Sequence, residues 1–215
     1  MQPVICLVTD RRRLPGGSEA VLVEHIAAAA RAGVHLVQIR ERDLDARALT
    51  RVAAAAVDAV RGTATRILVN DRTDVALASG AHGVHLRGDS APARRIRAIV
   101  PQGFLIGRSV HSREEAERAA AEGGLDYLMF GTVFETASKP GVRAAGPATL
   151  AAIASSVTLP VLAIGGVTVS GMAEVAEAGA AGFGAIGLFG GCPPDRLQVV
   201  VREASLAFDT LSRVP

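Results

Sequence analysis

Short apolar runs rich in β-branched residues alternate with alanine-rich stretches along the whole chain, and this alternation limits the fold more than any other feature. A strand followed by a helix and a second strand pairs in parallel through a right-handed crossover. Eight such units in one chain close best as a (β/α)8 TIM barrel, with an open doubly wound sheet as the alternative. The predicted strands are Val4–Thr9, His35–Ile39, Ile67–Val69, Gly83–Leu86, Phe104–Ile106, Tyr127–Phe130, Val161–Ile164 and Phe183–Ile186.

The stretches between these runs carry the start and stop signals of helices. Hydroxyl and carboxylate side chains stand where N-caps are expected, and glycines stand where the helices should end. No break in composition marks a second domain, so residues 1–215 are predicted to form one barrel domain. The predicted caps are Ser18, Asp45, Ser112 and Ser170, and the predicted stops are Gly33, Gly80, Gly123 and Gly179.

Composition excludes several classes of protein. The net charge is only +2, and aromatic residues make up 3% of the chain with no tryptophan, so neither a basic nor a base-stacking nucleic-acid surface is expected. No apolar run reaches transmembrane length, which predicts a protein that binds no membrane and lies in the cytoplasm. Cys6 and Cys192 lack the spacing of a metal site.

The loops that follow the strands of a (β/α)8 barrel build its binding site, so polar residues after each run are the candidates. Arg40 and Lys139 suit an anion, while Asn70 and Asp71 suit substrate orientation or Mg²⁺. Solvated charges and an ordinary strand-ending turn are the alternatives for these residues. The candidate substrate-binding residues are Gln38, Arg40, Asn70, Asp71, Ser109, Thr136, Ser138 and Lys139.

Two glycine-rich segments follow the seventh and eighth strands. Glycine lets backbone N–H groups approach an oxyanion, and the loops after these two strands often hold phosphate in such barrels. The alternative is that the glycines only make tight turns. The candidate phosphate-binding residues are Gly165, Gly166, Gly187, Leu188 and Gly190.

His111 is the leading candidate for a catalytic acid or base. It follows the fifth strand beside Ser109, and an imidazole titrates near neutral pH. A surface or helix-capping histidine is the alternative. His35 and His85 fall at the start of one strand and inside another, so both are predicted to be structural.

The order of the motifs resembles the thiamine phosphate synthase and TenI superfamily, and the resemblance covers nearly the whole chain. It implies a TIM barrel that acts on a small phosphorylated thiazole in thiamine biosynthesis. The segments that carry it are Leu7-Val8-Thr9-Asp10, Gln38-Ile39-Arg40-Glu41, Val69-Asn70-Asp71, Gly83-Val84-His85-Leu86, Ile106-Gly107-Arg108-Ser109-Val110-His111, Gly131 to Lys139 and Ala163-Ile164-Gly165-Gly166-Val167.

The synthase branch of this superfamily uses two acidic residues to hold Mg²⁺ and the diphosphate of a hydroxymethylpyrimidine. Asp71 matches the first acidic residue, whereas Ser90 takes the place of the second unless Asp89 serves instead. The lysine that this branch places after Arg-Glu is Arg42 here. Thr136, Ser138 and Lys139 keep a Thr-x-Thr/Ser-Lys pattern that suits an anion.

The TenI branch resembles the segments Ser109 to Ala116 and Phe130 to Thr136 more closely. That resemblance predicts an isomerase, a thiazole tautomerase that aromatises a carboxythiazole phosphate by proton transfer through His111, with no cofactor and no metal. The alternatives are a Mg²⁺-dependent thiamine phosphate synthase and a phosphate-binding regulatory protein without activity. The sequence leaves open whether the chain forms a homo-oligomer.

Overall fold

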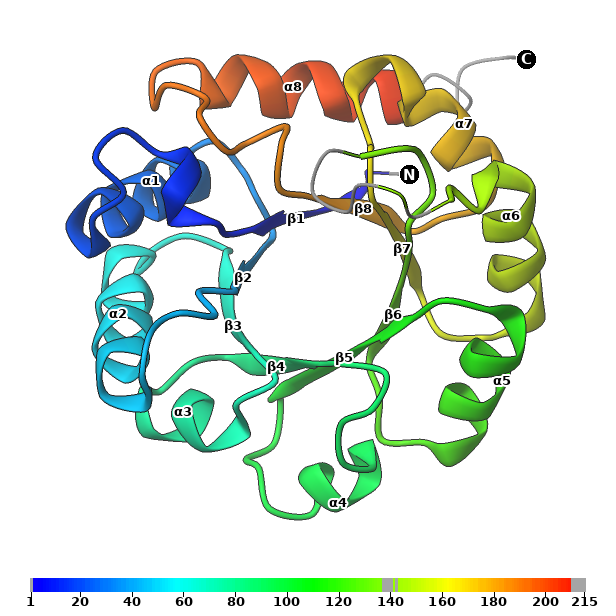
Figure 1. The fold of residues 1–215 in the computed structure, drawn as a ribbon, viewed down its shortest axis with the longest axis horizontal. Helices are drawn as coiled ribbons and strands as arrows, with labels where there is room; N and C mark the ends of the chain where they lie inside the picture. The colour runs from blue at the N-terminus through cyan, green and yellow to red at the C-terminus, as the bar shows by residue number, and fades with distance from the viewer. Residues whose placement is uncertain (1, 137–140, 142, 210–215) are drawn as a thin grey trace.

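Eight parallel strands form a closed barrel in the computed structural model, in the order β1-β2-β3-β4-β5-β6-β7-β8 with β8 pairing back to β1 (Figure 1). The structure describes residues 2–136, 141 and 143–209. The predicted TIM barrel is confirmed. The strands are β1 Val4–Val8, β2 Leu36–Ile39, β3 Arg66–Asn70, β4 Gly83–Leu86, β5 Leu105–Val110, β6 Tyr127–Phe130, β7 Val161–Ile164 and β8 Gly182–Ala185.

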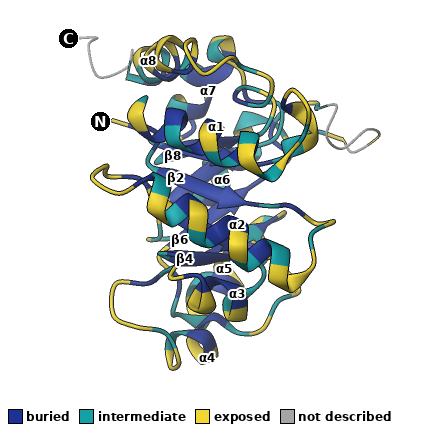
Figure 2. Ribbon diagram, turned by 90° about the vertical axis from the view of Figure 1, so that its left-hand side faces the viewer, coloured by how far each residue is buried: buried dark blue, intermediate teal, exposed yellow. Residues whose placement is uncertain are grey.

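Helices surround the barrel and turn their apolar faces toward it, while their outer faces are exposed (Figure 2). Among the described residues, no helix is long and apolar enough to cross a lipid bilayer. The helices are α1 Glu19–Arg31, α2 Ala46–Ala59, α3 Thr73–Ala78, α4 Ala93–Arg97, α5 Arg113–Glu122, α6 Gly146–Ser156, α7 Met172–Glu177 and α8 Leu197–Phe208, with short 3₁₀ turns at Arg11–Arg13 and Val169–Gly171.

Helix caps follow the sequence signals with one exception. The side chains of Ser18, Asp45 and Ser112 each accept a hydrogen bond from a backbone N–H in the first turn of their helix. Ser170 was predicted to cap a helix, but it lies inside the 3₁₀ turn Val169–Gly171, and α7 begins only at Met172. The residues predicted to begin this helix form the 3₁₀ turn instead.

The core has two layers because successive side chains of a strand point to opposite faces. The larger layer lies between the strands and the helices. The smaller layer fills the barrel interior and includes Cys6, Leu68, Tyr127 and Met129. A Cβ atom added to Gly107 would lie 2.1 Å from the Tyr127 ring, so the glycine in β5 makes room for the tyrosine in β6.

Strand β5 is longer than the sequence predicts, because it continues through Arg108 and Ser109 to Val110. Ser109 was predicted to lie in a loop, but it is part of the strand and faces the barrel interior. Arg108 lies on the opposite face, where its guanidinium donates to the Ala91 carbonyl at 2.5 Å and pairs with Glu122 at 3.5 Å. The sequence pattern ends the strand at Ile106 because the polar residues Arg108 and Ser109 interrupt the apolar run.

Candidate functional site

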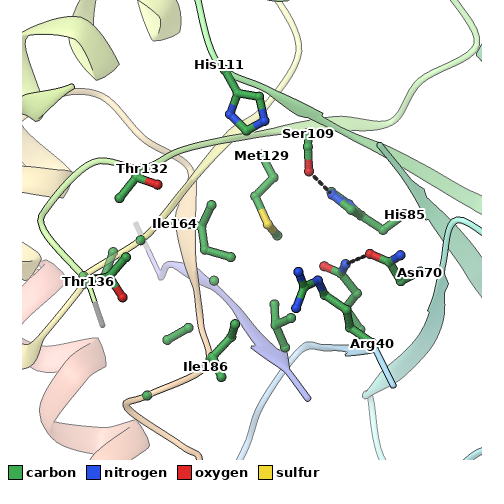
Figure 3. A pocket seen from close by; sticks show the side chains of 18 of the residues that line it. Arg40, Asn70, His85, Ser109, His111, Met129, Thr132, Thr136, Ile164 and Ile186 are labelled. Carbon is green, nitrogen blue, oxygen red and sulfur yellow. Dashed lines mark hydrogen bonds between the residues drawn. The ribbon is translucent and has the colours of Figure 1, made fainter. Parts of the chain in front are cut away.

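A cavity of about 1030 Å³ opens at the carboxyl ends of the strands, above the inner core layer (Figure 3). Val8, Met129 and Ile164 contribute apolar surface to it, and polar side chains from the strand ends and loops surround that surface. This is the end at which (β/α)8 barrels place their binding sites. Its size is sufficient for two small molecules side by side.

The charge of the cavity favours anions. Among the described residues, five arginines line it against three carboxylates. Excess positive charge around a partly apolar cavity raises the local concentration of negatively charged ligands. The arginines are Arg13, Arg40, Arg42, Arg87 and Arg118, and the acidic residues are Asp89, Glu115 and Glu135.

The buried carboxylate of Glu41 organises the loop after β2. It accepts hydrogen bonds from the Thr9 hydroxyl at 2.6 Å and from the Arg11 guanidinium at 3.0 Å. The Thr9 hydroxyl in turn accepts the backbone N–H of Arg40 at 3.0 Å. These bonds hold the Arg40 backbone while its guanidinium extends into the cavity (Figure 3).

Arg40 lies in an electropositive and partly buried environment. Burial lowers the pKa of its guanidinium, and the nearby charge of Arg42 lowers that pKa further. Both effects disfavour the positive charge, and a bound anion would relieve both. The position of Arg40 therefore suits contact with a negatively charged group.

Gln38 and Asn70 form a fixed amide pair on adjacent strands. The Gln38 Nε2 group donates to Asn70 Oδ1 at 2.8 Å (Figure 3). The Gln38 oxygen is buried and has no hydrogen-bond partner among the described residues. A buried acceptor of this kind is costly to leave unpaired, so it suits a ligand that carries an N–H or O–H donor.

His85 belongs to a buried hydrogen-bonded chain that ends in the cavity. Its Nδ1 atom lies 2.9 Å from the Tyr127 hydroxyl, and its Nε2 atom lies 2.9 Å from the Ser109 hydroxyl. Burial, helped by the charge of Arg40, lowers the pKa of His85 to about 3, so the ring is neutral at physiological pH. The chain Tyr127–His85–Ser109 therefore fixes the position of the Ser109 hydroxyl at the cavity.

His111 lies at the opposite side of the cavity mouth from Arg40 (Figure 3). Its backbone N–H donates to Glu115 at 2.7 Å, and its Nδ1 atom lies 2.5 Å from the Gly131 carbonyl oxygen. A carbonyl oxygen only accepts, so Nδ1 carries the proton. Nε2 is then the ring nitrogen that is available to a ligand in the cavity.

Asp71 is held by the loop after β4. Its Oδ1 atom accepts a hydrogen bond from the Ser90 hydroxyl, and its Oδ2 atom lies 3.7 Å from the Arg87 guanidinium. The same guanidinium pairs with Asp89 at 2.7 Å. No group of three or more His, Cys, Asp or Glu side chains among the described residues is arranged to hold a metal ion.

Comparison with known proteins identifies the family. Residues 5–188 match the family model described as thiamine monophosphate synthase. The chain belongs to the thiamine monophosphate synthase family.

Curated relatives in this family are named as thiamine-phosphate synthases. One from Roseiflexus castenholzii is 39% identical over 194 residues, which cover 88% of this chain and 82% of the relative. One from Methanoculleus marisnigri is 44% identical over 162 residues, covering 74% and 75% of the two chains. The solved thiamine phosphate pyrophosphorylase from Pyrococcus furiosus superimposes with a TM-score of 0.82 at 31% identity, with 96% of each chain covered.

These relatives overturn the predicted tautomerase, and with it the assignment as an isomerase. The prediction relied on two short segments after β5 and β6, whereas the similarity to thiamine-phosphate synthases extends over most of the chain. Two short segments cover far less of the chain than the similarity that supports the synthases. The membership in the superfamily itself is confirmed.

The structure of this family member brings most of the predicted site residues to one cavity, although their binding roles stay predictions. Asp71 faces Ser90 and Arg87 and does not line the cavity. Ser138 and Lys139 lie outside the described residues. The predicted residues on the cavity are Gln38, Arg40, Asn70, Ser109, His111, Thr136, Gly165, Gly166, Gly187 and Leu188.

The glycine segments lie where predicted, but they also have a structural role. A Cβ atom on Gly166 would lie 2.3 Å from the Glu135 carbonyl oxygen, and one on Gly165 would lie 2.7 Å from the Thr132 side chain. Gly190 does not line the cavity, and its N–H donates to the Ile186 carbonyl at 2.7 Å. Its amide is thus used within the loop and is not turned toward a phosphate.

Several residues of the cavity were not predicted as site residues. His85 was predicted to be only structural, and neither Arg13 nor Arg118 on α5 was singled out as a site residue. Alternation along β4 is the signal for His85, because Val84 and Leu86 face the helices and the residue between them must face inward. The sequence offers no comparable signal for Arg118, whose approach depends on how α5 packs.

Proposed function

We propose that the protein is a thiamine-phosphate synthase, a transferase that joins hydroxymethylpyrimidine diphosphate to a thiazole phosphate. The observation that supports this best is the similarity over most of the chain to relatives with that name. The cavity supports it independently, because a single site of about 1030 Å³ with five arginines suits two anionic molecules.

The reaction forms one bond and breaks one. The thiazole nitrogen bonds to the methylene carbon of the pyrimidine, and the bond from that carbon to the diphosphate oxygen breaks. The electron pair of the broken bond leaves with diphosphate, so the protein must stabilise negative charge as it develops there. The protein must also hold the two substrates with the nitrogen facing the carbon.

The residues divide naturally between the two substrates. Arg40 and Arg42, from the loop after β2, are placed for the diphosphate. Gln38 offers its unpaired oxygen to an amino group of the pyrimidine, and Ser109 offers its oriented hydroxyl. The loops after β7 and β8 are placed for the phosphate of the thiazole.

His111 takes a different role in this proposal from the one predicted for a tautomerase. A thiazole nitrogen that carries no proton needs no base before it attacks carbon. The Nε2 atom of His111 therefore serves as a contact to the substrate, with Gly131 and Glu115 holding the ring and backbone in place.

The family resemblance implies Mg²⁺ for a synthase, and the residues present do not fit a cage of two carboxylates. Both oxygens of Asp71 have partners within the chain, and Ser90 stands where the second carboxylate is expected. The Arg87 guanidinium lies between Asp71 and Asp89, at the place where a cation would be needed. We therefore assign no step of the reaction to a metal.

Synthesis in vitro tests the proposal. The purified protein is incubated with hydroxymethylpyrimidine diphosphate and thiazole phosphate, with MgCl₂ and separately with EDTA, and thiamine phosphate is measured by oxidation to its fluorescent product. The proposal expects product in at least one of the two conditions. Absence of thiamine phosphate in both, from a protein that is folded by circular dichroism, would reject it.

A further inference from the structure

The loop after β4 places an arginine between two carboxylates at the edge of the cavity. Arg87 pairs with Asp89 at 2.7 Å through one terminal nitrogen and lies 3.7 Å from Asp71 through the other. The backbone N–H of Arg87 donates to the Ser90 hydroxyl at 2.8 Å, and that hydroxyl donates to Asp71. The serine thus closes the loop and ties it to Asp71, the residue that follows β3.

The loop after β4 is also held on the side that faces away from the cavity. The Arg108 guanidinium, on the outer face of β5, donates to the Ala91 carbonyl at 2.5 Å and pairs with Glu122 on α5. Arg108 is only 7% exposed, so this support lies inside the protein. A loop anchored on both sides holds Arg87 near one position instead of leaving it free in solvent.

Arg87 lines the same cavity as Arg40 and Arg42, and its side chain is 56% exposed, so its guanidinium can reach a ligand. A guanidinium binds the oxygens of a phosphate through parallel N–H groups and stays charged at any physiological pH. A divalent cation between Asp71 and Asp89 would instead meet this fixed positive charge and would have to displace it.

We propose that Arg87 is the resident cation for the diphosphate group, so that the protein binds diphosphate without needing a divalent metal ion. This inference rests on the proposed function, because it assigns Arg87 to the diphosphate of the pyrimidine substrate. The arginine neutralises Asp71 and Asp89 in the free protein and contacts the diphosphate in the complex. Ser90 supports it by keeping Asp71 turned toward the loop.

Binding of inorganic diphosphate, measured by isothermal titration calorimetry in EDTA and in MgCl₂, tests this role. The wild type should bind in EDTA, and Mg²⁺ should tighten binding by no more than about threefold. Arg87→Gln should weaken binding in EDTA by about tenfold or more, because hydrogen bonds to charged groups are lost. Wild-type binding that occurs only with Mg²⁺, or an Arg87→Gln variant that binds like the wild type, would overturn the inference.

The matched control is Arg61→Gln. Arg61 also pairs with a nearby carboxylate, Asp58 at 2.8 Å, and is 77% exposed, but it follows α2 and does not line the cavity. This variant should bind diphosphate like the wild type. Equal losses in both variants would show a general charge effect and would overturn the specific role of Arg87.

A second variant covers the case in which Arg87→Gln fails to fold. The double variant Arg87→Gly with Ser90→Asp removes the cation and supplies a second carboxylate. This double variant should bind Mn²⁺, detected by electron paramagnetic resonance, at concentrations at which the wild type does not. Mn²⁺ binding by the wild type equal to that of the double variant would contradict the inference.

The two proposals fail in different ways. A protein that makes no thiamine phosphate but binds diphosphate in EDTA through Arg87 would reject the proposed function and leave the binding role of Arg87 intact. A protein that makes thiamine phosphate but binds diphosphate only with Mg²⁺ would keep the function and reject the role of Arg87.

Discussion

On the side of the cavity formed by β2 to β5, side chains are hydrogen-bonded to one another, whereas on the side formed by β7 and β8 glycine backbone lines the cavity. Gln38 with Asn70 and His85 with Ser109 are examples of the first kind. Gly165 and Gly166 are examples of the second. The first side can therefore recognise the shape and charge of a ligand in detail, while the second lets an anion and the neighbouring loop approach closely.

The largest effect is expected from Arg40→Ala on the side-chain side. Removal of this guanidinium deletes charge-assisted hydrogen bonds to the diphosphate, and kcat/KM for thiamine phosphate formation should fall about 100-fold. Steady-state kinetics with the pyrimidine diphosphate as the varied substrate measures the loss. A change within about threefold would place the diphosphate elsewhere, and Arg61→Ala provides the control for a general change in charge.

Gly166→Ala tests the backbone side. The new Cβ would collide with the Glu135 carbonyl at 2.3 Å, and the φ of +65° is strained for alanine. We expect the free energy of unfolding in urea to fall by about 2 kcal/mol more than in Gly62→Ala.

Gly62 is the matched control because its φ is +79° and a Cβ there would meet no atom within 4 Å. Its replacement measures the backbone strain alone, so the difference between the two variants measures the collision. Equal losses of unfolding free energy in both variants would mean that the loop after β6 moves aside easily. The backbone side of the cavity would then not depend on close packing at Gly166.

Acid should destabilise the protein in part through the side-chain side of the cavity. Burial lowers the pKa of His85 from its usual 6.5 to about 3, so the unfolded chain binds a proton there that the folded protein rejects. Stability from this group is complete above pH 6.5 and is lost as the pH falls toward 3. Between pH 6.5 and 5 the loss should be about 2 kcal/mol.

Two histidines at the other end of the barrel act in the same direction. The Nδ1 atoms of His35 and His82 accept backbone N–H groups of Ile5 and Ile67 at 3.1 and 2.9 Å, and burial lowers the pKa of each. Urea unfolding at a series of pH values measures the sum, and His85→Gln should flatten the curve. An unchanged slope in that variant would exclude His85 as a main cause.

The smallest effect is expected from His111→Gln. If His111 only contacts the substrate, kcat/KM for synthesis should fall less than about tenfold. A loss of about 10²–10⁴-fold with an unchanged melting temperature would instead indicate proton transfer by this ring. Turnover and melting temperature measured on the same preparation separate these outcomes.

The barrel could be predicted from the sequence because its signals are local. Most strands are short apolar runs, and many turns carry a glycine or a capping residue, so the order of elements follows without knowledge of distant contacts. The same local signals were enough to predict that His111 and Gly165 lie at the same end of the barrel. The end of β5 was missed because an inward serine and an outward arginine interrupt its apolar pattern.

The contacts that shape the site could not be predicted, because they join residues far apart in the chain. Thr9 meets Glu41 across 32 positions, and His85 meets Tyr127 across 42. Such pairs depend on strand register and on which face each side chain takes. The position of Arg87 between Asp71 and Asp89 depends likewise on the path of one loop, which no propensity describes.

The close packing of Gly107 against Tyr127 has a consequence for how relatives of this chain can diverge. A larger residue at 107 leaves no room for the tyrosine ring, and a smaller residue at 127 removes the hydroxyl that holds His85. Substitutions at these two positions are therefore expected to be inherited together. A lineage that changes the pair would also have to change how Ser109 is oriented, and so its choice of substrate.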